Sequence, residues 1–345
     1  MAAETEPGRA ASGLHPGWKE IVEPVKPFLE QVANQLAEQV EAFAPEIVPY
    51  ARYALTNHGK QLRPVLVALS AGATGKISES LVTVAVIIEM VHLATLVHDD
   101  VMDEAVMRRR RPTLAANWGN QVSVLLGDCL FAHAVKLAAS FPTPEICRAV
   151  AGATNTVCAG EILQTHQRRN FGFNRAEYFT VLEMKTAELF ALSCDLGASI
   201  GGASGAHRGA LRKYGLALGT AYQVFDDCLD LFGSEATVGK SLGTDLANGK
   251  LTLPLLVVLE HGSGQDQAQL REYVEHWESH LLPYVLELLD KYEARSGSCQ
   301  TIHQYLDRAR QSLQPVPDSA SREALIALTY FLAQQTDGLG VSQTT

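Results

Sequence analysis

The feature that most constrains the fold is a helical spacing of apolar residues along almost the whole chain. Between residues 21 and 43, apolar side chains recur every three or four positions, as at Phe28, Val32 and Leu36. The same spacing predicts further helices that start near Pro64 and that span 78–107, 120–140, 145–167, 175–200, 206–231 and 322–333. No stretch alternates between apolar and polar residues as a half-buried strand does. We therefore predict an all-α fold, a single large bundle of roughly ten or more helices.

The composition agrees with one large domain. Of the 345 residues, 47% are apolar and 19% are charged, which is enough apolar material for a sizeable core. Residues 1–17 are rich in glycine, alanine and proline, and we expect a disordered N-terminus there and a single domain over 18–345. Glu4 and Glu6 argue against an organelle-targeting helix, because such helices contain few acidic residues. We expect a cytoplasmic protein.

Charge, hydropathy and cysteine content exclude several function classes. A net charge of -10 and a pI of about 5.6 oppose nucleic-acid binding, which needs a basic surface. The most apolar stretch, 81–101, is interrupted by Glu89, His92 and Asp99, so we interpret it as a buried helix and expect no membrane insertion. The six cysteines form no CxxC pair, which predicts buried, reduced thiols and no zinc site.

Two DDxxD motifs, each at the end of an apolar helical segment, carry the chemistry. They are Asp99, Asp100 and Asp103, and Asp226, Asp227 and Asp230. In a helix the first and last aspartate of each motif share one face, and the middle one is rotated by roughly 100°. Buried carboxylates are costly without cations, and an all-oxygen ligand set favours Mg²⁺, which also binds substrate phosphates. One such motif on a polar helix would be a solvated surface, but two copies on apolar helices favour a metal site.

Basic residues suited to phosphate occur in separate clusters along the chain. They are Lys60 and Arg63 in GKQLRP, the run 108–111, Lys185 beside Thr186, and Lys240 and Lys250 in a glycine-rich segment. Any one of these clusters alone would indicate only a charged surface. Together they supply more positive charges than one diphosphate needs. This predicts that one diphosphate is bound through metal and a second is bound directly by lysine and arginine. The aspartates and arginines of the stretch 96–113 then need not pair with each other.

The order of these motifs resembles that of the trans-isoprenyl diphosphate synthases, or polyprenyl synthetases. From about residue 28 onwards the chain reads GKxxRP, ExxH, DDxxD followed by RR, GE, KT, a glutamine before the second DDxxD, GKxxGxD and GKxTLP. The resemblance implies a homodimer, with one catalytic domain of the isoprenoid synthase type around a central cavity. It also implies a prenyltransferase that condenses isopentenyl diphosphate with an allylic diphosphate, head to tail, to give an all-trans polyprenyl diphosphate.

The resemblance further implies roles for individual residues. The allylic diphosphate would bind roughly three Mg²⁺ ions held by Asp99, Asp103 and Asp226, supported by Asp100, Asp227 and Asp230. The same diphosphate would contact Arg108, Lys185 and Lys240, and isopentenyl diphosphate would bind Lys60, Arg63, His92 and Arg109. Thr186 and Gln223 would lie near the reacting carbons, with Asp245 and Lys250 in a closing loop. Lys185, Thr186, Gln223 and Arg108 form the expected catalytic set, and the released diphosphate is the expected base.

The residues one turn before Asp99 bear on the product length. Ala94 and Thr95 are small where short-chain members of the family often carry an aromatic residue. One helical turn rises about 5.4 Å, so each turn without bulky side chains admits roughly one more five-carbon unit of the growing product. The small residues before Asp99 therefore predict a medium- to long-chain product of about C30 to C50. Alternatively, Phe131 on another helix stops growth near C20, and the enzyme is a short-chain geranylgeranyl or farnesyl diphosphate synthase.

The chain departs from the family pattern in two segments, and two other functions compete. His58 and Gln61 stand in a segment that usually reads GGKRxRP, and Arg110 stands where a glycine is usual. A class I terpene cyclase is disfavoured by the second DDxxD motif and by GKQLRP. A non-catalytic partner subunit is disfavoured because both aspartate motifs are present.

Overall fold

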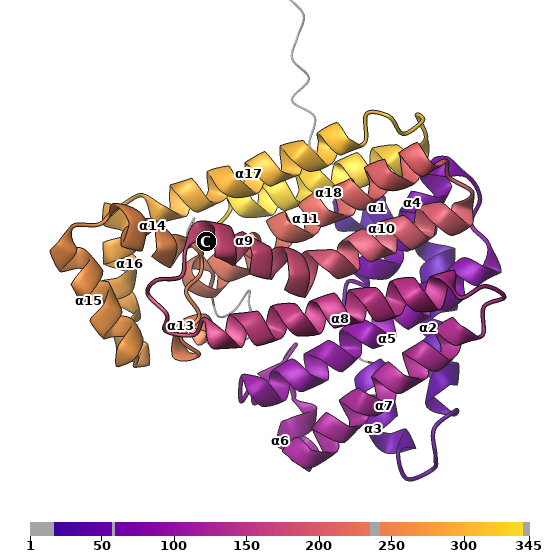
Figure 1. The fold of residues 1–345 in the computed structure, drawn as a ribbon, viewed down its shortest axis with the longest axis horizontal. Helices are drawn as coiled ribbons and strands as arrows, with labels where there is room; N and C mark the ends of the chain where they lie inside the picture. The colour runs from indigo at the N-terminus through magenta and orange to yellow at the C-terminus, as the bar shows by residue number, and fades with distance from the viewer. Residues whose placement is uncertain (1–16, 57–58, 235–241, 341–345) are drawn as a thin grey trace, which may run out of the picture.

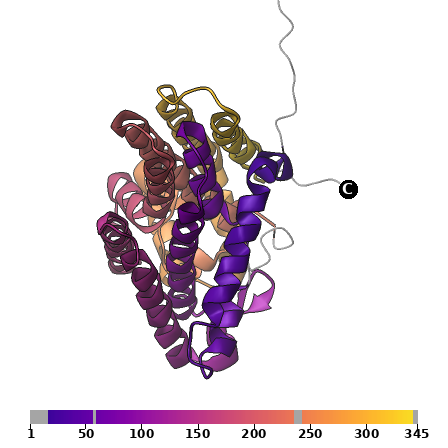
Figure 2. The same ribbon diagram turned by 90° about the vertical axis from the view of Figure 1, so that its right-hand side faces the viewer.

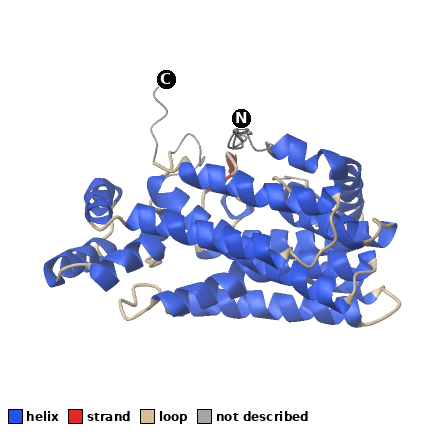
Figure 3. Ribbon diagram, turned by 90° about the horizontal axis from the view of Figure 1, so that it is seen from above, coloured by secondary structure: helices blue, strands red, loops and turns tan. Residues whose placement is uncertain are grey.

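The computed structural model confirms the all-α prediction and describes residues 17–56, 59–234 and 242–340. The expected disorder at the N-terminus, Lys240 and His58 lie outside the described residues, apart from Gly17. Figure 3 shows how completely helices dominate the described chain. The elements are α1 (Trp18–Val22), η1 (Glu23–Val25), α2 (Lys26–Val40), α3 (Val48–Leu55), α4 (Leu62–Thr74), α5 (Glu79–Met102), β1 (Met107–Arg108), β2 (Arg111–Pro112), α6 (Leu114–Trp118), α7 (Asn120–Ala139), α8 (Glu145–His166), α9 (Arg175–Leu182), η2 (Glu183–Ala187), α10 (Glu188–Gly201), α11 (Gly205–Phe232), α13 (Thr244–Ala247), α14 (Leu253–His261), α15 (Gly264–Glu275), η3 (Ser279–Leu281), α16 (Leu282–Lys291), α17 (Ala294–Ser312) and α18 (Ala320–Asp337).

The centre of the bundle is built from long helices in close contact. Helix α10 packs against α4 and α11, and α11 packs in turn against α17 (Figure 1). Small residues permit this approach: a Cβ atom at Gly197 would lie 2.4 Å from the carbonyl oxygen of Val67, and one at Gly215 would lie 2.6 Å from that of Phe190. Figure 2 shows the N-terminal helices, drawn in indigo, along the near side of this stack.

Helix α5 is apolar around its whole circumference because it is surrounded by other helices, namely α2, α4, α7 and α10. By length and composition alone α5 and α7 could cross a membrane. However, 72% of the most apolar window of α5 is buried inside the protein, against 39% for α7. Two of the cysteines, Cys194 and Cys228, are buried as predicted, but Cys158 is exposed on α8.

The helix predicted over 78–107 ends earlier, at Met102. Glu104 adopts a left-handed conformation, with φ 50°. The amide of Glu104 donates to the carbonyl of Val101 and the amide of Ala105 to that of Asp100, which is the hydrogen-bond pattern of a Schellman helix end. The arginine run then forms a small antiparallel hairpin, β1 and β2, in place of a further helical turn.

The helix predicted over 175–200 is also divided, because residues Glu183–Ala187 form a π-helical segment, η2, between α9 and α10. π-Helical turns are uncommon and often occur at functional sites. Here the segment contains Lys185 and Thr186, two of the residues that the sequence singled out.

Candidate active site

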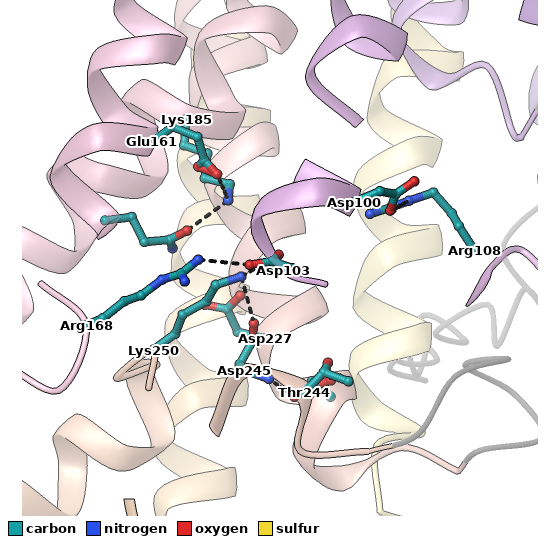
Figure 4. Close-up of polar contacts among 12 residues, drawn as sticks. Asp100, Asp103, Arg108, Glu161, Arg168, Lys185, Asp227, Thr244, Asp245 and Lys250 are labelled. Carbon is teal, nitrogen blue, oxygen red and sulfur yellow. Dashed lines mark hydrogen bonds and ion pairs between the residues drawn. The ribbon is translucent and has the colours of Figure 1, made fainter. Parts of the chain in front are cut away.

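The first aspartate motif lies where α5 ends, and its three side chains have different partners. Asp100 is buried and accepts a 2.6 Å hydrogen bond from Nε of Arg108. Asp103 accepts hydrogen bonds from Lys250 at 2.8 Å and from Arg168 at 2.9 Å. Figure 4 shows Asp100 and Arg108 set apart from the group around Asp103. One aspartate of this stretch, Asp100, therefore pairs with an arginine of the same stretch, Arg108.

The charges around Asp103 and Asp99 set their pKa values in opposite directions. Burial alone would raise the pKa of Asp103, but Lys250, Lys185 and Arg168 together lower it. For Asp99, burial outweighs Lys185 and Arg108 and raises the pKa to about 7, helped by Glu161 and Asp103. Asp99 is thus a carboxyl group whose negative charge the protein compensates only in part.

The second aspartate motif lies near the end of α11, where Asp227 and Asp230 are both buried. Oδ2 of Asp227 accepts a 2.6 Å hydrogen bond from the hydroxyl of Tyr178, and Oδ1 accepts one of 2.8 Å from Nε2 of Gln223. Burial, with the nearby charge of Asp245, raises the pKa of Asp227 to about 8 despite these two donors. Asp230 accepts from the hydroxyl of Thr244 and from the backbone amide of Asp245, at 2.5 and 3.0 Å.

The π-helical segment directs two neighbouring side chains toward different helices. Lys185 is hydrogen-bonded to Glu161 and, at 2.8 Å, to Oε1 of Gln164, both on α8. The hydroxyl of Thr186 donates to Oε1 of Gln223 on α11 at 2.8 Å. Gly160 permits this arrangement, because a Cβ atom there would lie 2.7 Å from the backbone nitrogen of Lys185.

A separate basic group gathers around the middle of α5. The pKa of His92 is held well below its usual range by burial first, and then by Arg63, Arg109 and Arg108. Burial lowers the pKa of Arg63, and the nearby charge of Glu89, which is also buried, acts in the opposite direction. Among the described residues, buried Nε of Arg63 and Nε2 of Gln61 lack a hydrogen-bond partner. Buried donors without partners are uncommon, and here they mark a place for an anion.

Other members of the expected isopentenyl diphosphate site show how the segment before α4 is arranged. The backbone at Gly59 packs on Arg109, since a Cβ atom there would lie 2.6 Å from Nη2 of that arginine. Lys60 is exposed, with Nζ 6.0 Å from the centre of the Trp18 ring and 5.4 Å from that of Phe331. Gln61, one of the departures from the family pattern, has a left-handed backbone, with φ 49°.

The two positions expected to govern product length differ in their surroundings. Ala94 is completely buried, whereas Thr95 is partly exposed and donates a 2.7 Å hydrogen bond to the carbonyl of His92. Thr95 shares the face of α5 that carries Asp99, because it lies four residues before it. Phe131 on α7 packs against His98, with the ring centres 5.7 Å apart.

Four residues that touch these groups were not predicted from the sequence. Arg168 follows α8 and is 65 residues away from Asp103 in the chain. Tyr178 lies in α9, 49 residues before Asp227. Glu89 and Glu161 stand in the ExxH and GE motifs, which could have drawn attention to them. Nothing in the local sequence around Arg168 signals its contact.

The donor set fits Mg²⁺ that is shared with a bound diphosphate. Within the described part of the chain, no group of three or more His, Cys, Asp or Glu side chains is assembled to hold a metal by itself. Mg²⁺ commonly takes only one or two carboxylates and completes its shell with water and substrate phosphate. The raised pKa values of Asp99 and Asp227 reflect carboxyl groups that lack full compensation, which a divalent cation supplies.

Comparison with known proteins agrees with this geometry. The polyprenyl synthetase family model matches residues 45–289. Octaprenyl diphosphate synthase of Haemophilus influenzae is 34% identical over 312 residues, which cover 90% of this chain and 95% of that protein. Heptaprenyl diphosphate synthase component 2 of Bacillus subtilis is 33% identical, with 89% and 88% covered.

Solved structures give the same answer. A decaprenyl diphosphate synthase from Rhodobacter capsulatus superposes with a TM-score of 0.87 at 30% identity, covering 92% of this chain and 99% of that one. A polyprenyl synthase from Caulobacter crescentus, complexed with calcium and isoprenyl diphosphate, also has a TM-score of 0.87 at 30% identity, with 93% and 98% covered. The predicted fold, family and enzyme class are confirmed: the chain belongs to the polyprenyl synthetase family of prenyl diphosphate synthases.

Proposed function

We propose that this enzyme condenses isopentenyl diphosphate with an allylic diphosphate at the site described above. The observation that carries the proposal is the division of charge around α5. Carboxylates suited to metal lie at its C-terminal end, while Arg63, Arg109 and a neutral His92 form a separate basic group farther back. One diphosphate can therefore bind through Mg²⁺ and the other through side chains alone.

The proposed roles of the side chains follow from their charges. When bound, Mg²⁺ neutralises the allylic diphosphate and stabilises it as a leaving group. Lys185, Arg108 and Lys250 add positive charge on the same side, and Lys240 is retained from the family pattern. Arg63, Arg109 and Lys60 orient isopentenyl diphosphate so that its double bond can attack the allylic carbon. Thr186 and Gln223 face the reacting carbons, and the departing diphosphate accepts the proton that the new carbon–carbon bond releases.

The product is a medium- to long-chain polyprenyl diphosphate of about C30 to C50, by the one-unit-per-turn argument. Small side chains at Ala94 and Thr95 support this length, and so do the names of the octaprenyl, heptaprenyl and nonaprenyl diphosphate synthases among the relatives. One observation favours a short-chain product instead: Phe131 reaches His98, one residue from Asp99. A relative from Methanothermobacter thermautotrophicus, 29% identical, is named a short chain isoprenyl diphosphate synthase.

We also propose a cytoplasmic homodimer in which residues 18–345 form the catalytic domain. The surface that supports the dimer lies on α7 and α8, which carry the exposed apolar side chains Val124, Leu125, Val135, Ile162 and Leu163. Exposed apolar patches of this kind mark protein–protein interfaces. A heterodimer is the alternative, since one relative is named as component 2 of a heptaprenyl diphosphate synthase.

The test is a product assay with the purified chain alone. The chain is incubated with labelled isopentenyl diphosphate and farnesyl diphosphate, with and without Mg²⁺, and the dephosphorylated products are sized by reversed-phase chromatography. A Mg²⁺-dependent ladder that ends well above C20 is expected. A single C20 band would replace the long-chain proposal with the short-chain one. The absence of elongation with every allylic primer would contradict independent activity and indicate a second subunit.

A further inference from the structure

Tyr178 is a buried tyrosine that neither the metal nor the diphosphate roles above explain. It lies in α9 with 3% of its surface exposed, and its hydroxyl donates to Oδ2 of Asp227 at 2.6 Å. Burial first, and then the charge of Asp227, raise the pKa of Tyr178 well above its usual range, so the hydroxyl keeps its proton and acts as a donor.

The hydrogen bond from Tyr178 begins a chain that reaches the proposed catalytic residues. The second oxygen of Asp227 accepts from Nε2 of Gln223 at 2.8 Å, and Oε1 of Gln223 accepts from the hydroxyl of Thr186 at 2.8 Å. Four side chains from α9, α11 and η2 are thus connected, and every donor in the chain points toward Asp227.

The direction of these hydrogen bonds determines which atoms Gln223 and Thr186 turn toward their neighbours. A side-chain amide can face a neighbour with either its NH₂ group or its oxygen. In the structure Gln223 turns Nε2 toward Asp227 and Oε1 toward Thr186. The proton of the Thr186 hydroxyl is then committed to Gln223. If Tyr178 did not hold Oδ2, the buried carboxylate would keep a single side-chain donor and could rotate away from Gln223.

We propose that Tyr178 is a positioning residue for prenyl transfer, which fixes the Asp227 carboxylate and through it the orientation of Gln223 and Thr186. The proposal rests on the proposed function, in which Thr186 and Gln223 face the reacting carbons. Tyr178 itself touches neither substrate. Its removal should therefore lower turnover more than it weakens binding of isopentenyl diphosphate, since the basic group around Arg63 is unaffected.

The first experiment compares Tyr178→Phe with Tyr214→Phe in the full-length enzyme. Tyr214 is a matched control: it is also completely buried, and its hydroxyl donates a 2.6 Å hydrogen bond, but to the backbone carbonyl of Leu325. We expect Tyr178→Phe to lower kcat about ten-fold, as loss of a hydrogen bond to a carboxylate predicts, with KM changed less than about two-fold. Tyr214→Phe should leave kcat unchanged at a similar loss in Tm. Equal kcat values for the two variants would overturn the proposal.

The second experiment asks whether Tyr178 acts through the hydrogen bonds that connect it to Thr186. Tyr178→Phe and Thr186→Val are measured singly and together. If the two residues belong to one chain, the double variant should be no more than about two-fold slower than the slower single variant. Multiplicative effects on kcat would show that they act independently and would overturn the proposal.

Three further outcomes are distinguishable. If Tyr178→Phe does not fold, Asp227→Asn takes its place in the cycle with Thr186→Val, because an amide there cannot accept from both Tyr178 and Gln223, and the same non-additivity is expected. If the wild-type enzyme itself elongates no primer, the proposed function fails and the role of Tyr178 fails with it. An active wild type with an unaffected Tyr178→Phe variant would contradict only the role of Tyr178.

Discussion

We propose that Thr95 is the residue at which a substitution alters the length of the product most directly. It shares the Asp99 face of α5 and is partly exposed, whereas Ala94 is completely buried. We predict that Thr95→Phe shortens the product by at least one five-carbon unit, because an aromatic ring fills about one helical turn of the path. Thr95→Val has the same size as the wild type and should leave the product distribution unchanged. If Thr95→Phe and the wild type gave identical product ladders, the growing prenyl chain would have to follow a path that does not pass Thr95.

Arg110 occupies a backbone conformation that suits glycine. Arg109 and Arg110 connect β1 to β2 with φ values of 50° and 61°, as in the type I′ turn of a two-residue hairpin loop. A left-handed residue other than glycine costs about 1–2 kcal/mol, and glycine's greater freedom in the unfolded chain offsets part of this. We predict that Arg110→Gly raises the free energy of unfolding by about 0.5–1 kcal/mol, measured by denaturant titration. Arg110→Ala, which removes the same side chain without freeing the backbone, should show no such gain.

At the scale of elements, the close approach of α8 to the π-helical segment positions Lys185 and Thr186. Gly160 makes the approach possible, because a Cβ atom there would lie 2.7 Å from the nitrogen of Lys185 and 2.8 Å from Cβ of Met184. We predict that Gly160→Ala displaces the segment and lowers kcat at least about ten-fold, measured at saturating substrates.

A glycine on α11 provides the control for this prediction. A Cβ atom at Gly209 would meet nothing within 4 Å, so Gly209→Ala should leave kcat unchanged. The same variant should gain about 0.5–1 kcal/mol in stability, since alanine is the better helix former. If Gly160→Ala were as active as Gly209→Ala, the contact between α8 and the π-helical segment would have no part in positioning Lys185.

At the scale of the whole molecule, the buried aspartates couple stability to pH and to metal. The pKa values of Asp99 and Asp227, about 7 and about 8, lie above their usual value of 3.8. At these two groups the folded, metal-free protein binds more protons than the unfolded chain between about pH 4 and pH 8. The stability contributed by these two groups is present at low pH and is lost as the pH rises through 7 and 8.

Metal binding reverses the direction of this effect. Because Mg²⁺ binds ionised carboxylates, its binding releases protons and becomes stronger as the pH rises. We predict that saturating Mg²⁺ with inorganic diphosphate raises Tm more at pH 8.5 than at pH 6, measured by calorimetry at constant ionic strength. Diphosphate alone provides the control. An equal increase in Tm at both pH values would contradict the prediction.

The outer face of α7 and α8 leads to a prediction about assembly. Leu125, 63% exposed, belongs to this apolar surface, and Leu125→Glu places a charge where a second copy would pack. We predict that the wild type is a dimer, and this variant a monomer, in light scattering coupled to size exclusion. Tyr284 on α16 is a similarly exposed aromatic residue, 54% accessible, outside this surface, and Tyr284→Glu should leave the oligomeric state unchanged. A dimeric Leu125→Glu variant would place the interface on another face.

The sequence alone determined the helical class, the two aspartate motifs and the clusters of basic residues. The physical reason is that helical periodicity is local: residues four apart share a face whatever surrounds the helix. For the same reason the middle aspartates, Asp100 and Asp227, were expected to turn aside, and in the structure each has its own partners, Arg108 for the first and Tyr178 with Gln223 for the second. The motif order was specific enough to identify the family before any contact was known.

Only the tertiary structure decided what these residues meet and how they ionise. Arg168 reaches Asp103 across 65 residues of chain and Lys250 across 147, and no local spacing encodes such contacts. The Schellman end of α5 and the π-helical segment depend on how neighbouring loops and α8 pack, so the sequence placed one helix boundary five residues too late and overlooked the other. The raised pKa values of Asp99 and Asp227 arise first from burial, which exists only once the helices around them have assembled.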